Sequence, residues 1–135
     1  MTAGTRLALW RPRVLSLLRI IAALLFMEHG LIKHFHFPAR HGAPVPLPPT
    51  LFIAATIEVI GGGLLALGLF TRPVAFLCAG EMAMAYFGFN NKIGPWPALN
   101  LGDVTILFCW IFLYLFCEGG GAWSLDALRR RLGRA

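Results

Sequence analysis

Ionisable side chains cluster in the stretch MEHGLIKH, residues 27–34. Glu28, His29, Lys33 and His34 lie within two helical turns, directly after the apolar run LLRIIAALLF. Histidine, lysine and carboxylate groups can hydrogen-bond a polar ligand and exchange protons with it, so the grouping favours acid–base chemistry. No nucleotide-binding glycine loop, flavin motif or Ser/His/Asp arrangement accompanies it in the sequence.

Three further carboxylates, Glu58, Glu81 and Asp103, stand inside apolar segments. A charged side chain at the centre of a bilayer costs about 2.5–3.5 kcal/mol, so we expect each to face protein and not acyl chains. Residues three or four apart share one helix face. The predicted inward faces are Arg19, Ala22, Phe26, His29 and Lys33; Ala54, Glu58, Gly62 and Ala66; Cys78, Glu81, Ala85 and Gly88; and Asp103, Trp110, Tyr114 and Cys117.

These faces predict a polar pocket in the outer half of a helical bundle. His29, Lys33, Glu58 and Asp103 are the candidate ligand-binding residues, and His29, Glu58 and Asp103 are the candidate acid–base groups. Structural roles in the polar interior are predicted for Arg19, Glu81 and Arg72. The expected ion pairs are Lys33 with Glu58 or Asp103, and Arg19 with Glu81. Glu28 is rotated about half a turn from that interior and should face lipid, a partner or a second protomer.

Four apolar segments, at about 14–33, 50–70, 73–90 and 100–117, must position these side chains. The chain has 135 residues, of which 58% are hydrophobic and 13% charged, whereas about 25% charged residues is typical of a soluble domain. Each segment approaches the ~20 residues that a helix needs to cross a bilayer. We therefore expect a single domain over residues 1–135, an all-α integral membrane protein built as an antiparallel four-helix transmembrane bundle.

Capping residues predict where the helices begin. Thr50 suits the N-cap of the second helix, and Pro73 suits the first position of the third helix after a turn at Thr71 and Arg72. Ser124 suits the N-cap of a short amphipathic helix at about 124–133, which should lie on the membrane surface. The stretch HFHFPARHGAPVPLPPT after the first helix contains five prolines and cannot be helical.

Basic residues are distributed unevenly between the two ends of the predicted bundle. One end has Arg6, Arg11, Arg13, Arg72, Arg129, Arg130, Arg131 and Arg134, and the other has Lys33, Arg40 and Lys92. The positive-inside rule therefore predicts that both termini are cytoplasmic. The C-terminal RRRLGR is expected to meet anionic lipid headgroups, so the net charge of +6 does not indicate a nucleic acid as partner.

Cysteines and histidines give no strong redox or metal pattern. Cys78, Cys109 and Cys117 lie in the predicted spans without a CxxC pair, which favours a packing role. The remaining candidates for a metal site are His34, His36 and His41. They stand beside the proline-rich stretch and form a weak ligand pattern, so no metal site is predicted.

The motifs above resemble those of the DoxX family, from about Arg19 to Asp126. Arg19 is followed by His29-Gly30 and Lys33, similar to the family's Arg and Gly-x-x-Lys pattern. The other matching motifs are EVIGGG at 58–63 with GLFTR at 68–72, GD at 102–103 and GGGAWSLD at 119–126. The sequence departs from the family pattern at Glu81, where no charge is expected, and at Asp103, where a glutamate is expected.

The resemblance implies a small four-span protein of a bacterial inner membrane that is tied to oxidoreduction. Members of the family include a thiosulfate:quinone oxidoreductase subunit and part of a thiol-oxidative-stress complex with soluble partners. We therefore expect a membrane subunit of a quinone-linked oxidoreductase system, with quinone as the candidate cofactor. Two alternatives stay open: a non-catalytic anchor or scaffold for a soluble or membrane redox partner, and a small permease. Association into a homo-oligomer through the Glu28 face is a further hypothesis.

Overall fold

The computed structural model describes residues 3–38 and 46–133, which are mostly helical. The α-helices are α1 (Ala3–Phe35), α2 (Pro49–Leu67), α3 (Thr71–Ala85), α4 (Asn91–Ile93), α5 (Gly102–Glu118) and α6 (Leu125–Leu132), with the π-helical stretch η1 (Tyr86–Asn90) between α3 and α4. No strand occurs within the described ranges, so the predicted all-α class is confirmed for them. Arg40, His41 and Arg134, which entered the sequence predictions, lie outside the described residues.

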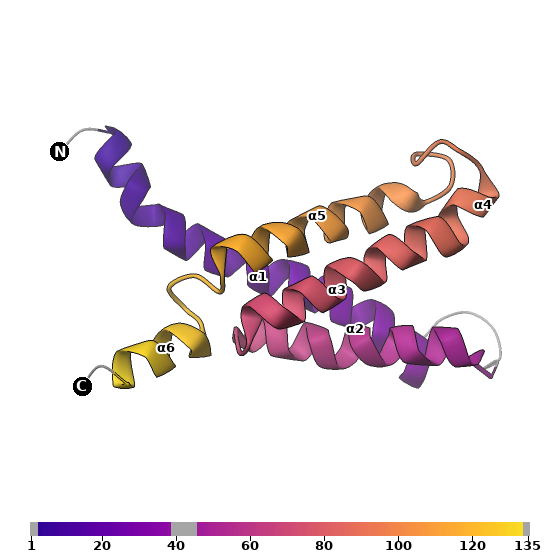
Figure 1. The fold of residues 1–135 in the computed structure, drawn as a ribbon, viewed down its shortest axis with the longest axis horizontal. Coiled ribbons are helices and arrows are strands. Elements are labelled where there is room, and N and C mark those ends of the chain that lie inside the picture. Colours follow the sequence, from indigo (N-terminus) through magenta and orange to yellow (C-terminus); the bar gives the residue numbers. More distant parts are fainter. Residues whose placement is uncertain (1–2, 39–45, 134–135) are drawn as a thin grey trace.

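The four long helices form two hairpins that lie against each other. Helix α1 packs mainly along α2, and α3 packs mainly along α5 (Figure 1). Helices α2 and α3 meet at a tight turn and then diverge, while η1 and α4 continue the course of α3 (Figure 1). Helix α6 and both termini lie at the end where α2 and α3 meet, which we call the α6 end.

Two glycines allow α1 and α2 to approach closely. A Cβ atom on Gly62 would lie 2.7 Å from Cβ of Met27, and one on Gly30 would lie 2.7 Å from the carbonyl oxygen of Ala55. Such distances are shorter than atoms tolerate without a shift of the backbone, so any side chain at either position would push the helices apart. The small-residue face predicted for the second helix therefore packs against α1 at Gly62, as expected for helices in lipid.

The core combines small side chains with three phenylalanines. The Phe26 ring of α1 meets Phe112 of α5 edge to face, with the ring centroids 4.8 Å apart, and Phe108 at 5.8 Å. Phe108 and Phe112 are stacked one turn apart on α5, and Leu115 continues their buried face. The face of α5 that points into the bundle is therefore the one with Phe108, Phe112 and Leu115, and not the predicted one.

The inward face predicted for the last apolar segment was wrong. Trp110 and Tyr114 are exposed, as are Asp103 and Cys117 at the two ends of the same stripe. The physical reason is that α5 is apolar almost all round, and a helix of this kind has no hydrophobic stripe to fix its rotation. The single carboxylate near its start was therefore an unsafe guide to its orientation.

The ends of the first two helices also differ from the prediction. Helix α1 begins at Ala3, well before position 14, and includes Pro12. The carbonyl oxygen of Pro12 accepts hydrogen bonds from the Ser16 hydroxyl and the Ala122 amide. Helix α2 starts at Pro49, where a proline at the first position lacks only an amide that would be unpaired anyway. Thr50 is thus inside the helix and is not its N-cap.

The turn between α2 and α3 lies at Gly68–Phe70, just before the predicted Thr71-Arg72. Gly68 and Phe70 both adopt left-handed backbone angles, with φ of 68° and 50°, which allows the chain to reverse in three residues. Pro73 consequently falls in the third position of α3. By contrast, the predicted N-cap of the last helix is confirmed, since the Ser124 hydroxyl accepts a hydrogen bond from the Ala127 amide at 3.1 Å.

Two of the described helices, α1 and α2, are long and apolar enough to cross a membrane by themselves. Helices α3 and α5 have 15 and 17 residues, fewer than the ~20 that a full crossing requires. A bundle with four membrane-crossing helices and a single domain over 1–135 therefore stays a prediction.

Candidate functional site

A cleft of about 810 Å³ opens between the two hairpins, bounded by α1, α2, α3, η1 and α5. We call it the central cleft. Its walls are mainly apolar and include Phe26, Ile53, Phe76, Leu77, Met84 and Phe108. Its polar side chains are His29, Lys33, Thr50, Glu58, Glu81, Asn90 and Thr105. Three of the four predicted ligand-binding residues thus lie along one cleft, together with a carboxylate that was predicted to be structural.

The predicted pair of Lys33 and Glu58 is present in the central cleft. The Lys33 ammonium donates to both carboxylate oxygens of Glu58, at 2.6 and 2.7 Å. Glu58 is only 2% exposed, whereas the Lys33 side chain is 29% exposed. In a low-dielectric site this charge-assisted contact is strong, and neither charge could be removed without leaving the other poorly compensated.

Close helix packing brings these two side chains together. Gly30 lies against Ala55 and Glu58, so that α1 and α2 touch one turn before Lys33. Lys33 and Gly30 share one face of α1 because they are three residues apart. Glu58 occupies the same small-residue face of α2 as Gly62. The sequence spacing therefore delivers both partners to the contact line between the two helices.

Glu81 brings a second carboxylate to the central cleft. One of its oxygens, Oε2, is buried and has no hydrogen-bond partner among the described residues. The predicted partner, Arg19, lies elsewhere. Lys33 lines the same cleft, but its ammonium already contacts both oxygens of Glu58. Glu81 is thus a polar group of the cleft wall that a ligand could satisfy, and its predicted pairing with Arg19 was wrong.

His29 lies at the rim of the central cleft. Its side chain is exposed, its Nδ1 is 2.9 Å from the carbonyl oxygen of Leu25, and its ring lies 6.1 Å from that of Phe108. The other ring nitrogen, Nε2, makes no hydrogen bond to the described residues. His29 therefore lies between the cleft and its surroundings and is not a buried side chain.

Asp103 does not line the central cleft. It is exposed at the start of α5, where its Oδ1 accepts a hydrogen bond from the adjacent Val104 amide. The rotation of α5 described above turns Asp103 outward and brings Val104 and Thr105 to the cleft instead. Sequence reasoning missed Thr105 and Asn90, whose side chains approach each other at 3.4 Å. Neither belongs to a charged or spaced motif that could have marked it.

Arg19 organises the α6 end and not the central cleft. Its guanidinium is fully buried and donates to backbone carbonyl oxygens only: those of Leu65, Ala66, Gly120 and Trp123. Leu65 and Ala66 are in the last turn of α2, where carbonyl groups lack helical partners and a positive charge is favoured. Arg19 therefore clamps α1, the end of α2 and the segment before α6 to one another.

Asp126 completes this clamp by capping α3 from a distance in the sequence. Its two carboxylate oxygens accept hydrogen bonds from the Phe70 and Thr71 amides at 3.0 and 2.8 Å, and its own amide donates to Gly68. Burial alone would raise the pKa of Asp126, but the hydrogen bonds from Thr71 and Phe70, with the charge of Arg130, outweigh it and leave the pKa below its ordinary value. The GLFTR and SLD motifs are therefore two halves of one contact.

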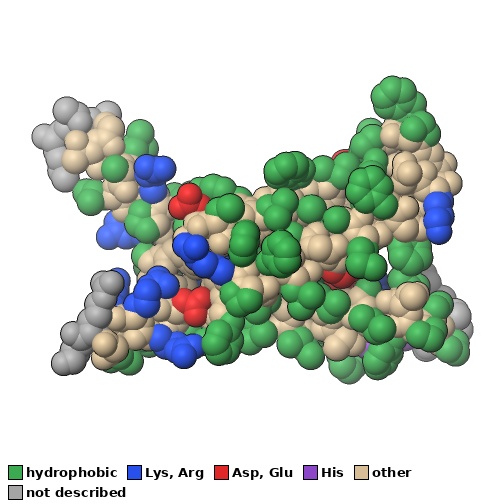
Figure 2. All heavy atoms as spheres, in the orientation of Figure 1, with side chains coloured by type: hydrophobic (Ala, Val, Ile, Leu, Met, Phe, Trp, Pro, Cys, Tyr) green, Lys and Arg blue, Asp and Glu red, His purple; other side chains and the backbone are tan. Residues whose placement is uncertain are grey.

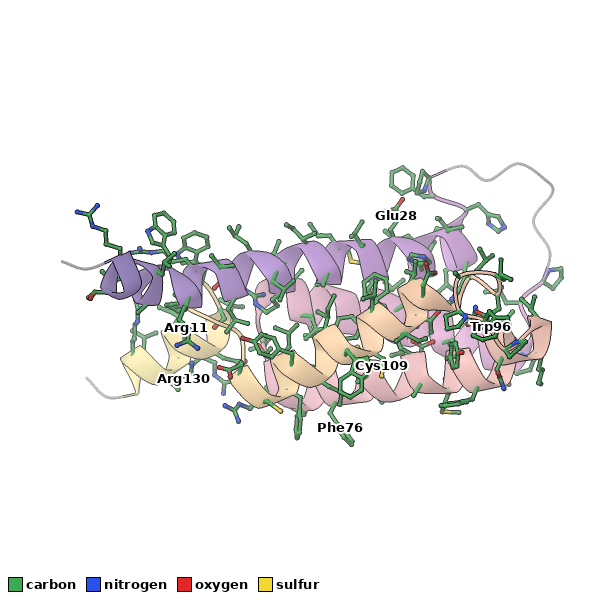
Figure 3. The ribbon with its side chains drawn as sticks, turned by 90° about the horizontal axis from the view of Figure 1, so that it is seen from above. Arg11, Glu28, Phe76, Trp96, Cys109 and Arg130 are labelled. Carbon is green, nitrogen blue, oxygen red and sulfur yellow. The ribbon has the colours of Figure 1, made fainter. Side chains whose placement is uncertain are left out.

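The remaining predicted residues lie outside the central cleft and the clamp. Arg72 is exposed beside the start of α3, so its predicted place in the polar interior was wrong. Glu28 lies on the side of α1 that faces away from the other helices (Figure 3), as its half-turn offset predicted. His34 approaches the Thr56 hydroxyl at 3.0 Å and the Phe52 ring. Cys78, Cys109 and Cys117 are free thiols.

Comparison with known proteins places the chain among membrane proteins. Residues 14–91 match the DoxX family. An uncharacterized protein of Haemophilus influenzae is 41% identical over 87% of this chain and 91% of its own length. The inner membrane protein YphA of Escherichia coli is 33% identical over 86% and 90%, and an uncharacterized membrane protein of Mycobacterium tuberculosis is 26% identical over 91% and 83%.

No solved structure matches the chain. The family match spans Arg19, Lys33, Glu58 and Arg72, so it includes the ion pair of the central cleft and the arginine of the helix clamp. The match covers more than half of the chain, and two relatives exceed 30% identity over most of their length, so the comparisons agree on one family. This chain belongs to the DoxX family of membrane proteins.

Proposed function

We propose that this protein is a membrane subunit of a quinone-linked oxidoreductase system, and that the central cleft receives the quinone headgroup. The observation that carries the proposal is the combination of an apolar cleft with the Lys33–Glu58 pair and the unpartnered oxygen of Glu81. Ligand sites commonly combine apolar walls with a few convergent polar groups. A quinone matches this pattern because its ring and tail are apolar and its two carbonyls are polar.

The chemistry offered by the cleft is hydrogen bonding and proton exchange. The Lys33 ammonium can donate to a quinone carbonyl, and the carboxyl groups of Glu58 and Glu81 can exchange protons with the ring oxygens as these are reduced or oxidised. His29 at the rim provides a route for protons to the surface. None of the described side chains in the cleft supplies electrons, so these would come from a partner protein.

The entrance to the cleft suits a lipophilic ligand. Helices α2 and α3 diverge from their turn (Figure 1), and their exposed apolar residues Ile53, Phe76 and Leu77 line the central cleft. Phe76 points away from the helix bundle in Figure 3. A tail could therefore extend from the cleft into the acyl chains while the headgroup stays beside Glu58.

We further infer that four helical segments cross a bacterial inner membrane with both termini on the cytoplasmic side. Helix α3 continues through η1 and α4 to Ile93, a length of about 34 Å at 1.5 Å per residue, and α5 spans about 26 Å. Basic side chains gather at the α6 end (Figure 2). The positive-inside rule places such an end in the cytoplasm, which leaves the central cleft in the outer half of the membrane.

A non-catalytic scaffold for a redox enzyme is the second candidate. Residues 4–14 of α1 are exposed throughout, and Trp10 and Leu7 provide an apolar surface that a partner could cover. In that case the central cleft would hold a lipid chain or remain a packing defect, and the ion pair would only fix the register of α1 against α2. The two candidates differ in what occupies the cleft.

Gly80 provides a direct test of the cleft. It lines the cleft, and a Cβ atom built on it meets nothing within 4 Å, so Gly80→Leu would fill the space without a backbone clash. Gly63 is the matched control, because it also has open space but does not line the cleft. The protein is purified in mild detergent, and bound quinone is measured by extraction and mass spectrometry.

We expect wild type and Gly63→Leu to retain quinone, and Gly80→Leu to lose most of it. Glu58→Gln should lose quinone and quinone-dependent turnover with the partner enzyme while the protein stays inserted. Equal retention by the Gly80 and Gly63 variants would move the ligand elsewhere. Phospholipid as the only extracted molecule from wild type would favour the scaffold role.

A further inference from the structure

A second cleft, of about 440 Å³, lies at the α6 end. It is bounded by the start of α3, the Gly119–Gly120 backbone and helix α6, and three arginines line it: Arg72, Arg129 and Arg130. We call it the arginine cleft. It is separate from the central cleft, with which it shares no lining residue.

The three arginines are not neutralised by ion pairs. Within the described ranges no carboxylate lies in salt-bridge distance of Arg72, Arg129 or Arg130, and the one acid of the cleft, Asp126, gives its two oxygens to the Phe70 and Thr71 amides. The Arg129 guanidinium is held over the Phe70 ring at 5.2 Å. The cleft therefore combines excess positive charge with a partly fixed guanidinium.

The framework around the arginine cleft is rigid. Arg19 donates to the carbonyl oxygens of Gly120 and Trp123, and the Ser16 hydroxyl accepts a hydrogen bond from the Trp123 amide. Asp126 joins α6 to the α2–α3 turn. A site that is organised before its ligand arrives loses less entropy on binding. Guanidinium groups recognise phosphate with paired hydrogen bonds, which makes a phosphate the anion that best fits this cleft.

The position of the cleft identifies the source of the phosphate. Basic side chains gather at the α6 end on the face seen in Figure 2, and Figure 3 shows Arg11 and Arg130 at that end with Trp96 at the other. Trp10 and Trp123 are exposed at the α6 end as well. Tryptophan and arginine together are typical of the level of lipid headgroups. Leu128 and Leu132 of α6 are also exposed and can contact the acyl boundary.

We propose that the arginine cleft binds the headgroup phosphate of an anionic phospholipid, with Arg72, Arg129 and Arg130 as its ligands. The lipid would fasten α6 to the start of α3 from outside, as Asp126 does from inside. This goes beyond general attraction of a basic end to an anionic surface, because it assigns the contact to three residues of one cleft and excludes other arginines at the same end.

Native mass spectrometry of the detergent-purified full chain tests the proposal. Phosphatidylglycerol is added as the anionic probe, phosphatidylcholine as the zwitterionic probe and inorganic phosphate as the soluble competitor. The test variant is Arg129→Gln with Arg130→Gln. Its matched control, Arg6→Gln with Arg13→Gln, removes the same charge from exposed positions at the same end, outside the cleft. Arg72→Gln is a second test variant in case the double variant does not fold.

We expect the test variants to bind phosphatidylglycerol more weakly, by about 10-fold for the double variant, and the control to keep wild-type binding. Equal losses in test and control variants would show attraction of the whole surface and overturn the proposal. It would also fall if wild type bound both phospholipids alike. Displacement of phosphatidylglycerol by inorganic phosphate would identify a soluble anion as the ligand instead.

Discussion

The Lys33 ammonium contacts both carboxylate oxygens of Glu58, at 2.6 and 2.7 Å, and so joins α1 to α2 beside the central cleft. Glu58 is buried, whereas Lys33 is partly exposed. The lysine is therefore the more exposed member of the pair, although both side chains line the cleft. Each charge depends on the other for its compensation.

A double-mutant cycle should reveal this dependence. Lys33→Met leaves the Glu58 carboxylate buried without a cation, and we expect it to lower the free energy of unfolding by about 3 kcal/mol. Glu58→Gln should cost a similar amount, and the double variant should cost clearly less than the sum of the two. Thermal unfolding of each variant in one detergent gives the comparison. Additive losses would show that the two side chains act independently.

The packing of α1 against α2 predicts that an added methyl group is destabilising at Gly62 and not at Gly63. We expect Gly62→Ala to destabilise the protein by about 1–3 kcal/mol because its Cβ would meet Met27 and Ala23. Gly63→Ala should be neutral or stabilising, because its Cβ meets nothing within 4 Å and alanine favours helix. The measurement is thermal unfolding of both variants. A similar response at both positions would contradict the close approach.

Sequence spacing predicted the contacts between helices better than the rotation of each helix. Lys33, Glu58 and Gly62 could be placed because charges and small residues are rare in an apolar helix, and each marks the face that must be protected from lipid. Helix α5 carries no such mark on its buried side. Its buried side chains are those of Phe108, Phe112 and Leu115, and the exposed Trp110 and Tyr114 are also large aromatic residues.

Long-range polar contacts were the part that the sequence could not supply. Arg19 was expected to pair with Glu81 because opposite charges attract, yet it binds backbone carbonyl oxygens. Backbone groups are present at every position, so the residue types in the sequence do not predict which of them Arg19 contacts. Asp126 was likewise left without an assigned role, although it belongs to one of the motifs on which the family resemblance was based. The capping of α3 by Asp126 explains that role.

The stability of the protein should depend on the ionisation of Asp126. Because the pKa of Asp126 is lower in the folded protein, its contribution is full above the ordinary value of about 3.9 and is lost as the pH falls through the folded value. We expect Asp126→Asn to lower the free energy of unfolding by about 1 kcal/mol near neutral pH, and so to unfold at a lower temperature. On acidification the variant should lose less further stability than wild type. Thermal unfolding measured across this pH range gives both quantities.

Asp103→Asn is the matched control for the acid series. Asp103 is an exposed carboxylate at the start of a helix, and the hydrogen bond that it makes is to its own neighbour, Val104. We expect this variant to follow wild type from neutral to acidic pH. If the Asp126 and Asp103 variants responded alike, the cap on α3 would not be the source of the acid sensitivity.

Arg19→Lys should be the most destabilising conservative change at the α6 end. Lysine keeps the charge, but a single ammonium cannot reach the four carbonyl oxygens that the planar guanidinium contacts on α2 and on the segment before α6. Carbonyl groups left unpaired in a buried site should lower the free energy of unfolding by about 3 kcal/mol in total.

Arg13→Lys, at an exposed position of the same helix, is the control and should behave like wild type. Thermal unfolding measures the loss of stability. If both variants were as stable as wild type, the carbonyl contacts of Arg19 would contribute nothing to the fold, and its place in the family motif would require a role in ligand binding instead.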